Sequence, residues 1–420
     1  MRNDSSHLVW SLFAAAFLVS TFAGADPLLS LAGRYSAGAE NAVLLMLCWM
    51  VWEFGTTNPP GLSRWMTVAG IAGAVHLVLQ RLGMDPWVWT GAVDTWSGRQ
   101  AGAAGQPVFS GALVALALPW VASWWWMAYM ALAIWVTGSR AAMLAAGAVI
   151  GWRLWNKPAR RLFLVALAAL GVFMVCHIHH GPASDGQRIE FSRVAIRAWS
   201  QRPVLGWGPA TGAVWFIRCR GAASGTICKH SHNLVTNVLV TQGLLGLAAW
   251  VLLISAGWRA ASCTTRGAML AAGVFGLFEP VPAVAYVILA IAVGIDAGGA
   301  PFTTDKGLFD VIREKWVKDR FRRRVLLPAA ALLFAFLSWE MVADHRVHLG
   351  DWGRAADMCP WEFAYCERVS DKAVASAWRH QGNPMAYAGA IKSLRQQDRP
   401  GSAEALVRIK NRMDPSRICK

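Results

Sequence analysis

The feature that most constrains this chain is a series of apolar stretches, each about 15 to 24 residues long, that recurs along most of its 420 residues. An α-helix rises about 1.5 Å per residue, so roughly 20 apolar residues cross the hydrocarbon layer of a bilayer. Charged residues make up 15% of the chain, whereas a soluble domain carries roughly 25%. The sequence therefore predicts an all-α, polytopic membrane protein.

We place eleven transmembrane helices on this pattern. They cover residues 7–24, 39–54, 65–82, 107–121, 124–138, 141–156, 161–177, 234–256, 267–279, 282–297 and 325–342. Two assignments stay open, because the turn at Ser123-Trp124 carries no charge and because Pro280 and Pro282 could bend one helix instead of separating two. An error of one span would invert the orientation of everything that follows.

Lysine and arginine indicate the orientation, since short loops rich in these residues remain in the cytoplasm. Basic segments of this kind lie at residues 152–161, 259–266 and 306–324. A cytoplasmic N-terminus places all three basic segments in the cytoplasm. The segments 83–106 and 178–233 and the chain from residue 343 onward then lie on the external side.

This topology divides the chain into a transmembrane domain, residues 1–342, with a large exported loop at 178–233, and a helical C-terminal appendage, residues 343–420. Both exported parts contain a pair of cysteines close in sequence. The pairs are Cys219 with Cys228 and Cys359 with Cys366. An oxidising compartment would allow each pair to form a disulfide, although free thiols fit the sequence equally well.

The net charge of +16 does not indicate nucleic-acid binding. The basic residues lie mostly in short loops and beside predicted spans, where topology and anionic lipid headgroups account for them. The chain also has 24 tryptophans, and clusters such as Trp124-Trp125-Trp126 fall at predicted helix ends. Tryptophan is typical of the membrane interface, so these clusters predict interfacial belts.

The exported loop departs from the charge rule, because it is basic on the external side. It carries Arg188, Arg193, Arg197, Arg202, Arg218, Arg220 and Lys229 against Asp185 and Glu190. Residues 188–200 predict an amphipathic helix with Ile189, Phe191, Val194 and Ile196 as its apolar positions, closed by residues 203–209. Arg193 and Arg197 are like charges four residues apart, which is unfavourable unless an anion or a carboxylate compensates. A solvated basic face is the alternative.

Arg140 and a histidine pair mark the external boundary of the membrane. Arg140 lies between two predicted spans, where a charged residue is a functional candidate and a guanidinium fork suits phosphate oxygens. A snorkelling side chain is the alternative. His230-Ser231-His232-Asn233 precedes the eighth span. A histidine there can take a proton from a hydroxyl near neutral pH, although an interfacial polar histidine is also common.

These residues resemble the motifs of one superfamily, that of the O-antigen ligases, O-antigen polymerases and bacterial protein O-oligosaccharyltransferases. The ligase signature H-[NSQ]-x9-G-x-x-[GTY] is met in full from His232-Asn233 to Gly243 and Gly246. Arg188, followed fifteen residues later by Pro203-x-x-Gly206-x-Gly208, is similar to a second family motif. Ser139-Arg140-Ala141-Ala142 is similar to a third. The resemblance spans about residues 95 to 300.

Weaker similarities concern the protein-glycosylating branch. Residues 99–107 resemble its R-x-x-G-x-x-G-Q-P stretch, and Phe278-Glu279-Pro280 resembles its E-x-P motif. That branch usually has asparagine after G-Q-P, whereas this chain has Val108. The branch therefore stays open.

The resemblance implies an enzyme of the bacterial inner membrane that transfers a glycan from an undecaprenyl-diphosphate carrier to an acceptor hydroxyl at the periplasmic face, with inversion and without a metal or other cofactor. His232 would be the general base. Arg140 and Arg188 would stabilise the departing diphosphate, with Arg193 or Arg197 in support. Asn233 would orient the histidine or bind sugar, His230 would have a secondary role, and Gly243 with Gly246 would allow close helix packing.

Several functions remain open at this point. The acceptor would be lipid A core for a ligase, a pilin-type protein for an oligosaccharyltransferase, or a growing glycan for a polymerase. A transporter or flippase of lipid-linked anions would also use arginines, but it predicts broken helices near the bilayer midplane and internal repeats. An inactive scaffold would leave the spacing from His232 to Gly243 unexplained.

Overall fold

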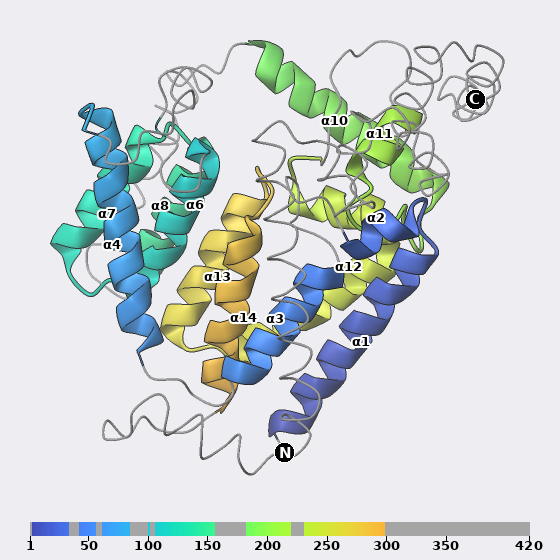
Figure 1. Cartoon of the computed structure of the whole chain (residues 1–420), viewed down its shortest axis with the longest axis horizontal. Coiled ribbons are helices and arrows are strands. Elements are labelled where there is room, and N and C mark those ends of the chain that lie inside the picture. The colour runs from blue at the N-terminus through green and yellow to red at the C-terminus, as the bar shows by residue number, and fades with distance from the viewer. Residues whose placement is uncertain are drawn as a thin grey trace, which may run out of the picture.

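The computed structural model describes residues 2–32, 42–55, 61–84, 100, 106–155, 182–219 and 231–298. All regular structure in these residues is helical, which confirms the predicted fold class (Figure 1). The helices are α1 (Arg2–Phe22), α2 (Pro27–Ala32), α3 (Ala42–Gly55), α4 (Leu62–Arg81), α6 (Pro107–Ala117) with the short 3-10 helix η2 (Leu118–Trp120), α7 (Trp124–Val136), α8 (Arg140–Leu154), α10 (Pro182–Gln201), α11 (Gly212–Cys219), α12 (Leu234–Ala260), α13 (Cys263–Gly276) and α14 (Ala283–Gly298).

Each predicted span that falls on described residues coincides with one of these helices. The turn at Ser123 separates α6 from α7, and Pro280 and Pro282 lie between α13 and α14, so both open assignments resolve into two helices. The predicted spans 161–177 and 325–342 and the appendage 343–420 lie outside the described residues. The count of eleven therefore stays a prediction.

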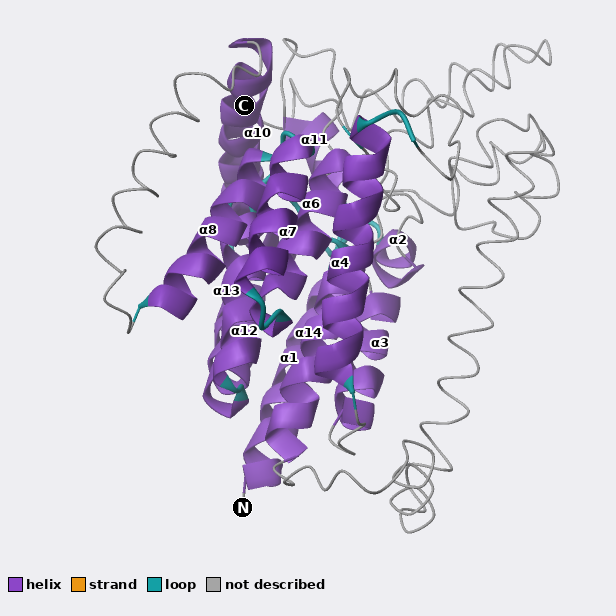
Figure 2. Cartoon of the chain, turned by 90° about the vertical axis from the view of Figure 1, so that its left-hand side faces the viewer, coloured by secondary structure: helices purple, strands orange, loops and turns teal. Residues whose placement is uncertain are grey.

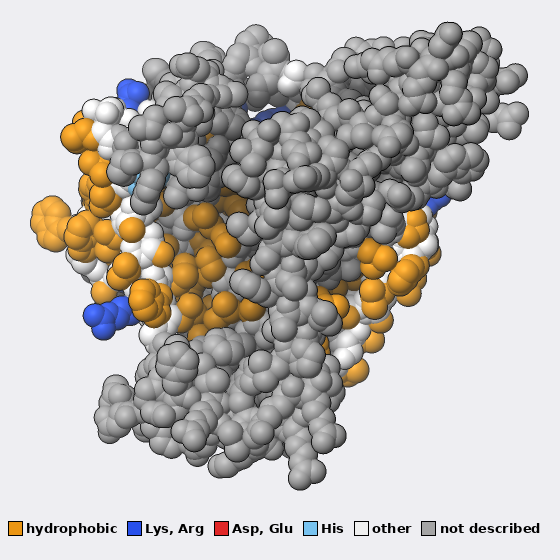
Figure 3. Space-filling view, in the orientation of Figure 1, with side chains coloured by type: hydrophobic (Ala, Val, Ile, Leu, Met, Phe, Trp, Pro, Cys, Tyr) orange, Lys and Arg blue, Asp and Glu red, His pale blue; other side chains and the backbone are white. Residues whose placement is uncertain are grey.

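By length and hydropathy, α4 and α12 qualify as membrane spans among the described helices. Shorter apolar helices lie beside them at Leu8–Phe22, Pro107–Trp120, Trp124–Val136 and Val284–Asp296. Many large apolar side chains of the described helices are exposed, and the coloured parts of Figure 3 are mainly hydrophobic. At the start of α7, Trp124, Trp125 and Trp126 are all exposed, with Trp125 at 87%, as expected of side chains at a membrane interface.

The helices form two groups joined by α13 (Figure 1). In one group α4, α6, α7 and α8 share a core of small residues and methionines, and Gly70 of α4 approaches α6 so closely that a Cβ there would lie 2.5 Å from the Cβ of Ala117. In the other group α1 packs on α12 and α3 packs on α14. Small residues at helix contacts are typical of membrane bundles, because they let the backbones approach. Helices α10 and α11 cover one end of the bundle, which we call the α10 end (Figure 2).

Helix α12 is broken at Gly243, whose φ of 67° and ψ of −166° are not helical. Four backbone hydrogen bonds join the residues on either side of the break to the loop at residues 203–208. The bonds run from Leu244 N to Pro203 O (2.9 Å), from Leu245 N to Val204 O (3.1 Å), from Trp207 N to Val240 O (2.9 Å) and from Gly208 N to Thr241 O (2.8 Å). The protein itself thus supplies hydrogen-bond partners for these backbone groups beside the break.

The break explains two glycine motifs together. A Cβ on Gly243 would lie 2.2 Å from Val204 O, and a Cβ on Gly206 would lie 2.4 Å from the carbonyl carbon of Thr241. Close approach was predicted at Gly243, but its partner is the 203–208 loop and not another helix. The three atoms nearest to a Cβ on Gly246 all belong to Gln242 of the same helix, so the role of Gly246 in packing between helices stays a prediction.

Candidate functional site

His232 immediately precedes Asn233 and α12 at the α10 end. Its φ of 55° places it in the left-handed region, which a residue with a Cβ seldom adopts. A strained backbone of this kind persists only where the surroundings impose it, and it is enriched at functional sites. The conformation turns the chain into α12 and fixes where the imidazole projects.

Asn233 holds this turn in place from both sides. Its Oδ1 accepts a hydrogen bond from Thr236 N (3.0 Å) and caps α12, while its Nδ2 donates to Leu277 O (2.8 Å) beyond the end of α13. Ser231 adds a contact, because its backbone N lies 3.4 Å from Asn237 Oδ1. Asn233 was expected to orient the histidine or bind sugar; its contacts join the turn to α12 and to Leu277, and both roles stay predictions.

The imidazole of His232 is joined to Arg188 through a carboxylate. Nδ1 of His232 lies 3.0 Å from Oε2 of Glu279, and Arg188 Nη2 donates to the other carboxylate oxygen, Oε1. Arg188 Nη1 also donates to Phe278 O (3.1 Å). The side chain of Glu279 is 10% exposed, against 27% for His232 and 33% for Arg188. We call these three residues the His232–Glu279–Arg188 cluster.

The charge state of Glu279 follows from its surroundings. Burial raises its pKa, but the hydrogen bond from His232, the charges of Arg188 and His232 and the hydrogen bond from Arg188 together outweigh burial and bring the pKa below its usual value. Glu279 is therefore ionised at neutral pH. A carboxylate facing Nδ1 favours the tautomer with the proton on Nδ1, which leaves Nε2 as the basic nitrogen.

Helix α10 contributes to the site twice. Arg188 contacts Glu279, and Phe191, three residues later on the same face, stacks on the ring of His232 with centroids 5.7 Å apart and planes at 16°. Phe191 is held in turn by a cluster that includes Val194 and Phe216. The amphipathic helix was thus predicted correctly in place, although Ile189 and Ile196, expected on its apolar face, are exposed.

The other predicted residues lie in different settings. Arg140 is the first residue of α8 and is half-buried, and Ser139 caps that helix by accepting from Ala142 N (3.3 Å). Its part in diphosphate binding rests on this position and stays a prediction. Arg197 donates to Cys219 O (3.2 Å) and so ties α11 to α10, whereas Arg193 is exposed on α10.

Some predictions fall partly or wholly outside the described residues. His230 lies outside them, and so do Cys228, Cys359 and Cys366, so the disulfides stay predictions. Cys219 is buried in α11, with Sγ 3.7 Å from Gln201 Oε1.

Glu279 and Phe191 are the site residues that sequence reasoning did not assign. Glu279 was noted only as part of a weak motif, yet an acidic residue at the end of an apolar stretch is itself a signal. Phe191 was expected only as an apolar position of its helix. Neither its stacking partner nor the partners of Glu279 can be deduced from spacing.

The fold and the site together define a helical membrane protein with a histidine–carboxylate–arginine cluster at one end of its bundle. A family model described as O-antigen ligase matches residues 125–251, from α7 into α12. The matched segment contains Arg188, the 203–208 loop and His232 to Gly246, and Glu279 lies beyond it. This match supports the O-antigen ligase-like superfamily. A comparison with curated proteins finds no match.

Proposed function

We propose that this protein transfers a glycan from an undecaprenyl-diphosphate carrier to an acceptor hydroxyl at the periplasmic face of the bacterial inner membrane. The family match supports glycosyl transfer of the ligase or polymerase kind. The observation that carries the proposal is the His232–Glu279–Arg188 cluster. It combines a base, the carboxylate that orients that base, and a guanidinium beside them.

His232 would act as the general base. With Nδ1–H donated to Glu279, Nε2 takes the proton of the acceptor hydroxyl as that oxygen attacks the anomeric carbon. The carboxylate stabilises the imidazolium that forms, in the way a third group orients the base in other nucleophilic sites. The bond from the anomeric carbon to the diphosphate oxygen breaks and its electron pair goes to that oxygen. Because the hydroxyl attacks the opposite face of the carbon, the configuration inverts.

The arginines have to stabilise the leaving group. A lipid diphosphate departs with an added negative charge, which positively charged donors fixed in advance stabilise. The contacts of Arg188 with Glu279 and Phe278 fix its guanidinium beside His232, and its remaining N–H groups can bind phosphate oxygens. We assign Arg140 the second contact, because it begins α8 at a predicted external boundary.

The broken helix bears on the transporter alternative. Transporters use a break in a helix to expose backbone groups to substrate near the midplane. At Gly243 the two amide and two carbonyl groups that bond to the 203–208 loop are occupied by protein, so these groups do not contact a substrate. The structure therefore favours the enzyme, with lipid A core, a pilin-type protein or a growing glycan as the acceptor.

The test is reconstitution of the purified protein in liposomes with undecaprenyl-diphosphate-linked glycan and each acceptor in turn. Product should form with one acceptor class, and His232→Ala should abolish it without changing the size-exclusion profile. His230→Ala is the matched control and should retain most of the activity. Wild-type product from His232→Ala would remove this histidine from the mechanism.

The orientation has its own test. A cysteine introduced at Ser184 should react with an impermeant reagent added outside the inner membrane, whereas one at Asp310 should not. The reverse labelling would place the His232 site in the cytoplasm and exclude a periplasmic acceptor.

A further inference from the structure

Phe191 of α10 covers one face of the His232 imidazole. The two ring centroids lie 5.7 Å apart and the planes meet at 16°, so the rings are stacked. The proposed mechanism gives Phe191 no role. A buried phenylalanine ordinarily fills space in a core, which requires no particular orientation toward a histidine. Nearly parallel planes at the proposed base therefore call for a separate explanation.

The ring of Phe191 is itself held by the core between α10 and α11. Phe191 is 6% exposed, and Phe216 packs against it edge-on, with centroids 5.3 Å apart and planes at 81°. Phe216 is fully buried and makes another edge-on contact, with Trp215 at 5.9 Å and 72°. Edge-to-face pairs are a preferred geometry of aromatic side chains. Phe191 thus presents a fixed face to His232.

The hydrogen bond to Glu279 and the stacking on Phe191 restrain different motions of the imidazole. The hydrogen bond holds Nδ1 at 3.0 Å from Oε2, but it tolerates a range of angles, so the ring can pivot about that atom. Stacking restricts the plane of the ring but permits rotation within the plane. Together the two contacts determine the direction of Nε2. That direction matters, because a general base has to reach the proton that it removes.

The same two contacts decide from which side an acceptor can reach the base. The side chain of His232 is 27% exposed, although Phe191 covers one of its faces and Glu279 faces its Nδ1. The exposed part of the imidazole therefore lies away from both neighbours. An acceptor hydroxyl would approach on that side.

We infer that Phe191 is a positioning residue for the proposed base: its ring fixes the plane of the His232 imidazole and thereby directs Nε2 toward the acceptor hydroxyl. This inference rests on the proposed function and deepens it. Helix α10 then serves the site in two ways, because Arg188 binds the carboxylate that holds Nδ1, and Phe191 holds the ring plane.

The first test separates kcat from KM in the reconstituted protein. Phe191→Leu keeps an apolar side chain but removes the aromatic face. It should lower kcat about tenfold and leave the KM values for donor and acceptor little changed, because Phe191 acts through His232 and not on either substrate. Phe191→Tyr keeps the ring and should retain most of the wild-type kcat. A wild-type kcat in Phe191→Leu, or equal losses in the two variants, would overturn the inference.

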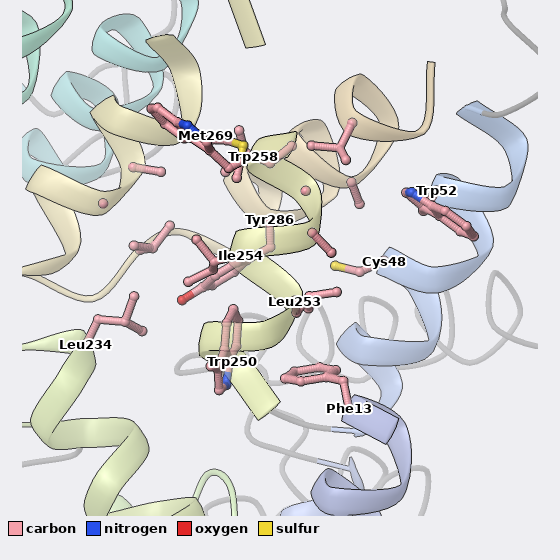
Figure 4. Close-up of a pocket in the computed structure, with 18 of the residues that line it drawn as sticks. Phe13, Cys48, Trp52, Leu234, Trp250, Leu253, Ile254, Trp258, Met269 and Tyr286 are labelled. Carbon is pink, nitrogen blue, oxygen red and sulfur yellow. The ribbon is translucent and has the colours of Figure 1, made fainter. Parts of the chain in front are cut away.

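Phe13 supplies a matched control for the loss of a buried aromatic ring. It lies on α1, is 2% exposed and packs edge-on against Trp250, with centroids 5.0 Å apart. It lines an apolar cavity of about 480 Å³ between α1, α3, α12, α13 and α14 (Figure 4). Neither Phe191 nor any residue of the His232–Glu279–Arg188 cluster lines that cavity. Phe13→Leu should therefore lower the melting temperature but not kcat. Equal losses of kcat in Phe13→Leu and Phe191→Leu would mean that Phe191 acts only through stability.

A spectroscopic test does not depend on glycan transfer. The ring current of Phe191 shields the imidazole that it covers. In protein labelled with ¹³C at histidine Cε1, the His232 resonance is the one that His232→Ala removes. That resonance should shift in Phe191→Leu and stay near its wild-type position in Phe191→Tyr. A resonance that does not move in Phe191→Leu would show that the rings are not stacked, which contradicts the inference.

A replacement variant covers the case in which Phe191→Leu fails to fold. Phe191→Met introduces an unbranched apolar side chain that adapts to irregular space, and it is expected to behave as Phe191→Leu in both tests. The two proposals fail separately. If the wild type is inactive with every acceptor, the proposed function fails; if it is active and the Phe191 variants without a ring transfer at the wild-type kcat, only the inference about Phe191 fails.

Discussion

Nδ1 of His232 and Oε2 of Glu279 lie 3.0 Å apart, although the two residues are separated by 47 positions in the chain. The histidine comes from the turn that begins α12, and the glutamate comes from the segment between α13 and α14. Their contact places the basic nitrogen of the imidazole away from the carboxylate and links it, through Glu279, to Arg188 on α10. Three segments therefore have to dock before the site exists.

Glu279→Gln should lower the rate of glycan transfer by about 100-fold, because an amide neither stabilises the imidazolium nor enforces one tautomer. Product formation at saturating donor and acceptor measures the effect on kcat. Glu190→Gln, on α10 and outside the cluster, is the control and should leave the rate near that of the wild type. Equal rates for the two variants would show that Glu279 does not orient the base.

The pH dependence of stability should identify Glu279 as a stabilising carboxylate. Its pKa in the folded protein lies below its usual value, so its contribution is present above the pKa of the unfolded chain, about 4.3, and is lost as pH falls through the folded pKa. The melting temperature of the wild type should exceed that of Glu279→Gln at neutral pH, and the gap should close below about pH 4. A gap that widened toward acid pH would contradict this. It would mean that burial raises the pKa of Glu279 by more than Arg188 and His232 lower it.

Arg188→Lys should reduce transfer by roughly tenfold or more, since a compact ammonium group lacks the planar fork of five N–H donors with which arginine contacts Glu279 and Phe278 O and still offers N–H groups to a diphosphate. Arg193→Lys is the matched control on the same helix, because Arg193 is exposed and outside the cluster. Initial rates of both variants at several donor concentrations would compare them. If Arg193→Lys lost more activity than Arg188→Lys, Arg193 would contribute more to diphosphate binding than Arg188.

Gly243→Ala should destabilise the fold by about 2 to 4 kcal/mol, because φ is positive and the new Cβ would meet Val204 O. Gly273→Ala on α13 is the control, since a Cβ there meets no atom within 4 Å. Thermal unfolding in detergent should show a clear drop for the first variant alone. If Gly243→Ala and the control melt at the same temperature, the 203–208 loop can move away from the new Cβ without a loss of stability.

Much of this architecture could be predicted because its signals are local. The length and composition of each apolar stretch placed the described spans, and the amphipathic pattern placed α10. The motifs singled out His232 and Arg188. Where a prediction depended on which face of a helix is covered, it was less secure: Ile189 and Ile196 are exposed because the core contacts of α10 run through Phe191 and Val194.

What only the tertiary structure decided is the set of partners. The sequence determined a helical membrane protein, its candidate base and the spacing from His232 to Gly243. It did not determine that Glu279 joins His232 to Arg188, that Phe191 covers the imidazole, or that Gly243 is glycine because the 203–208 loop replaces helical hydrogen bonds there. Periodicity and hydropathy act within one segment, whereas these contacts depend on segments that meet only after the helices have packed.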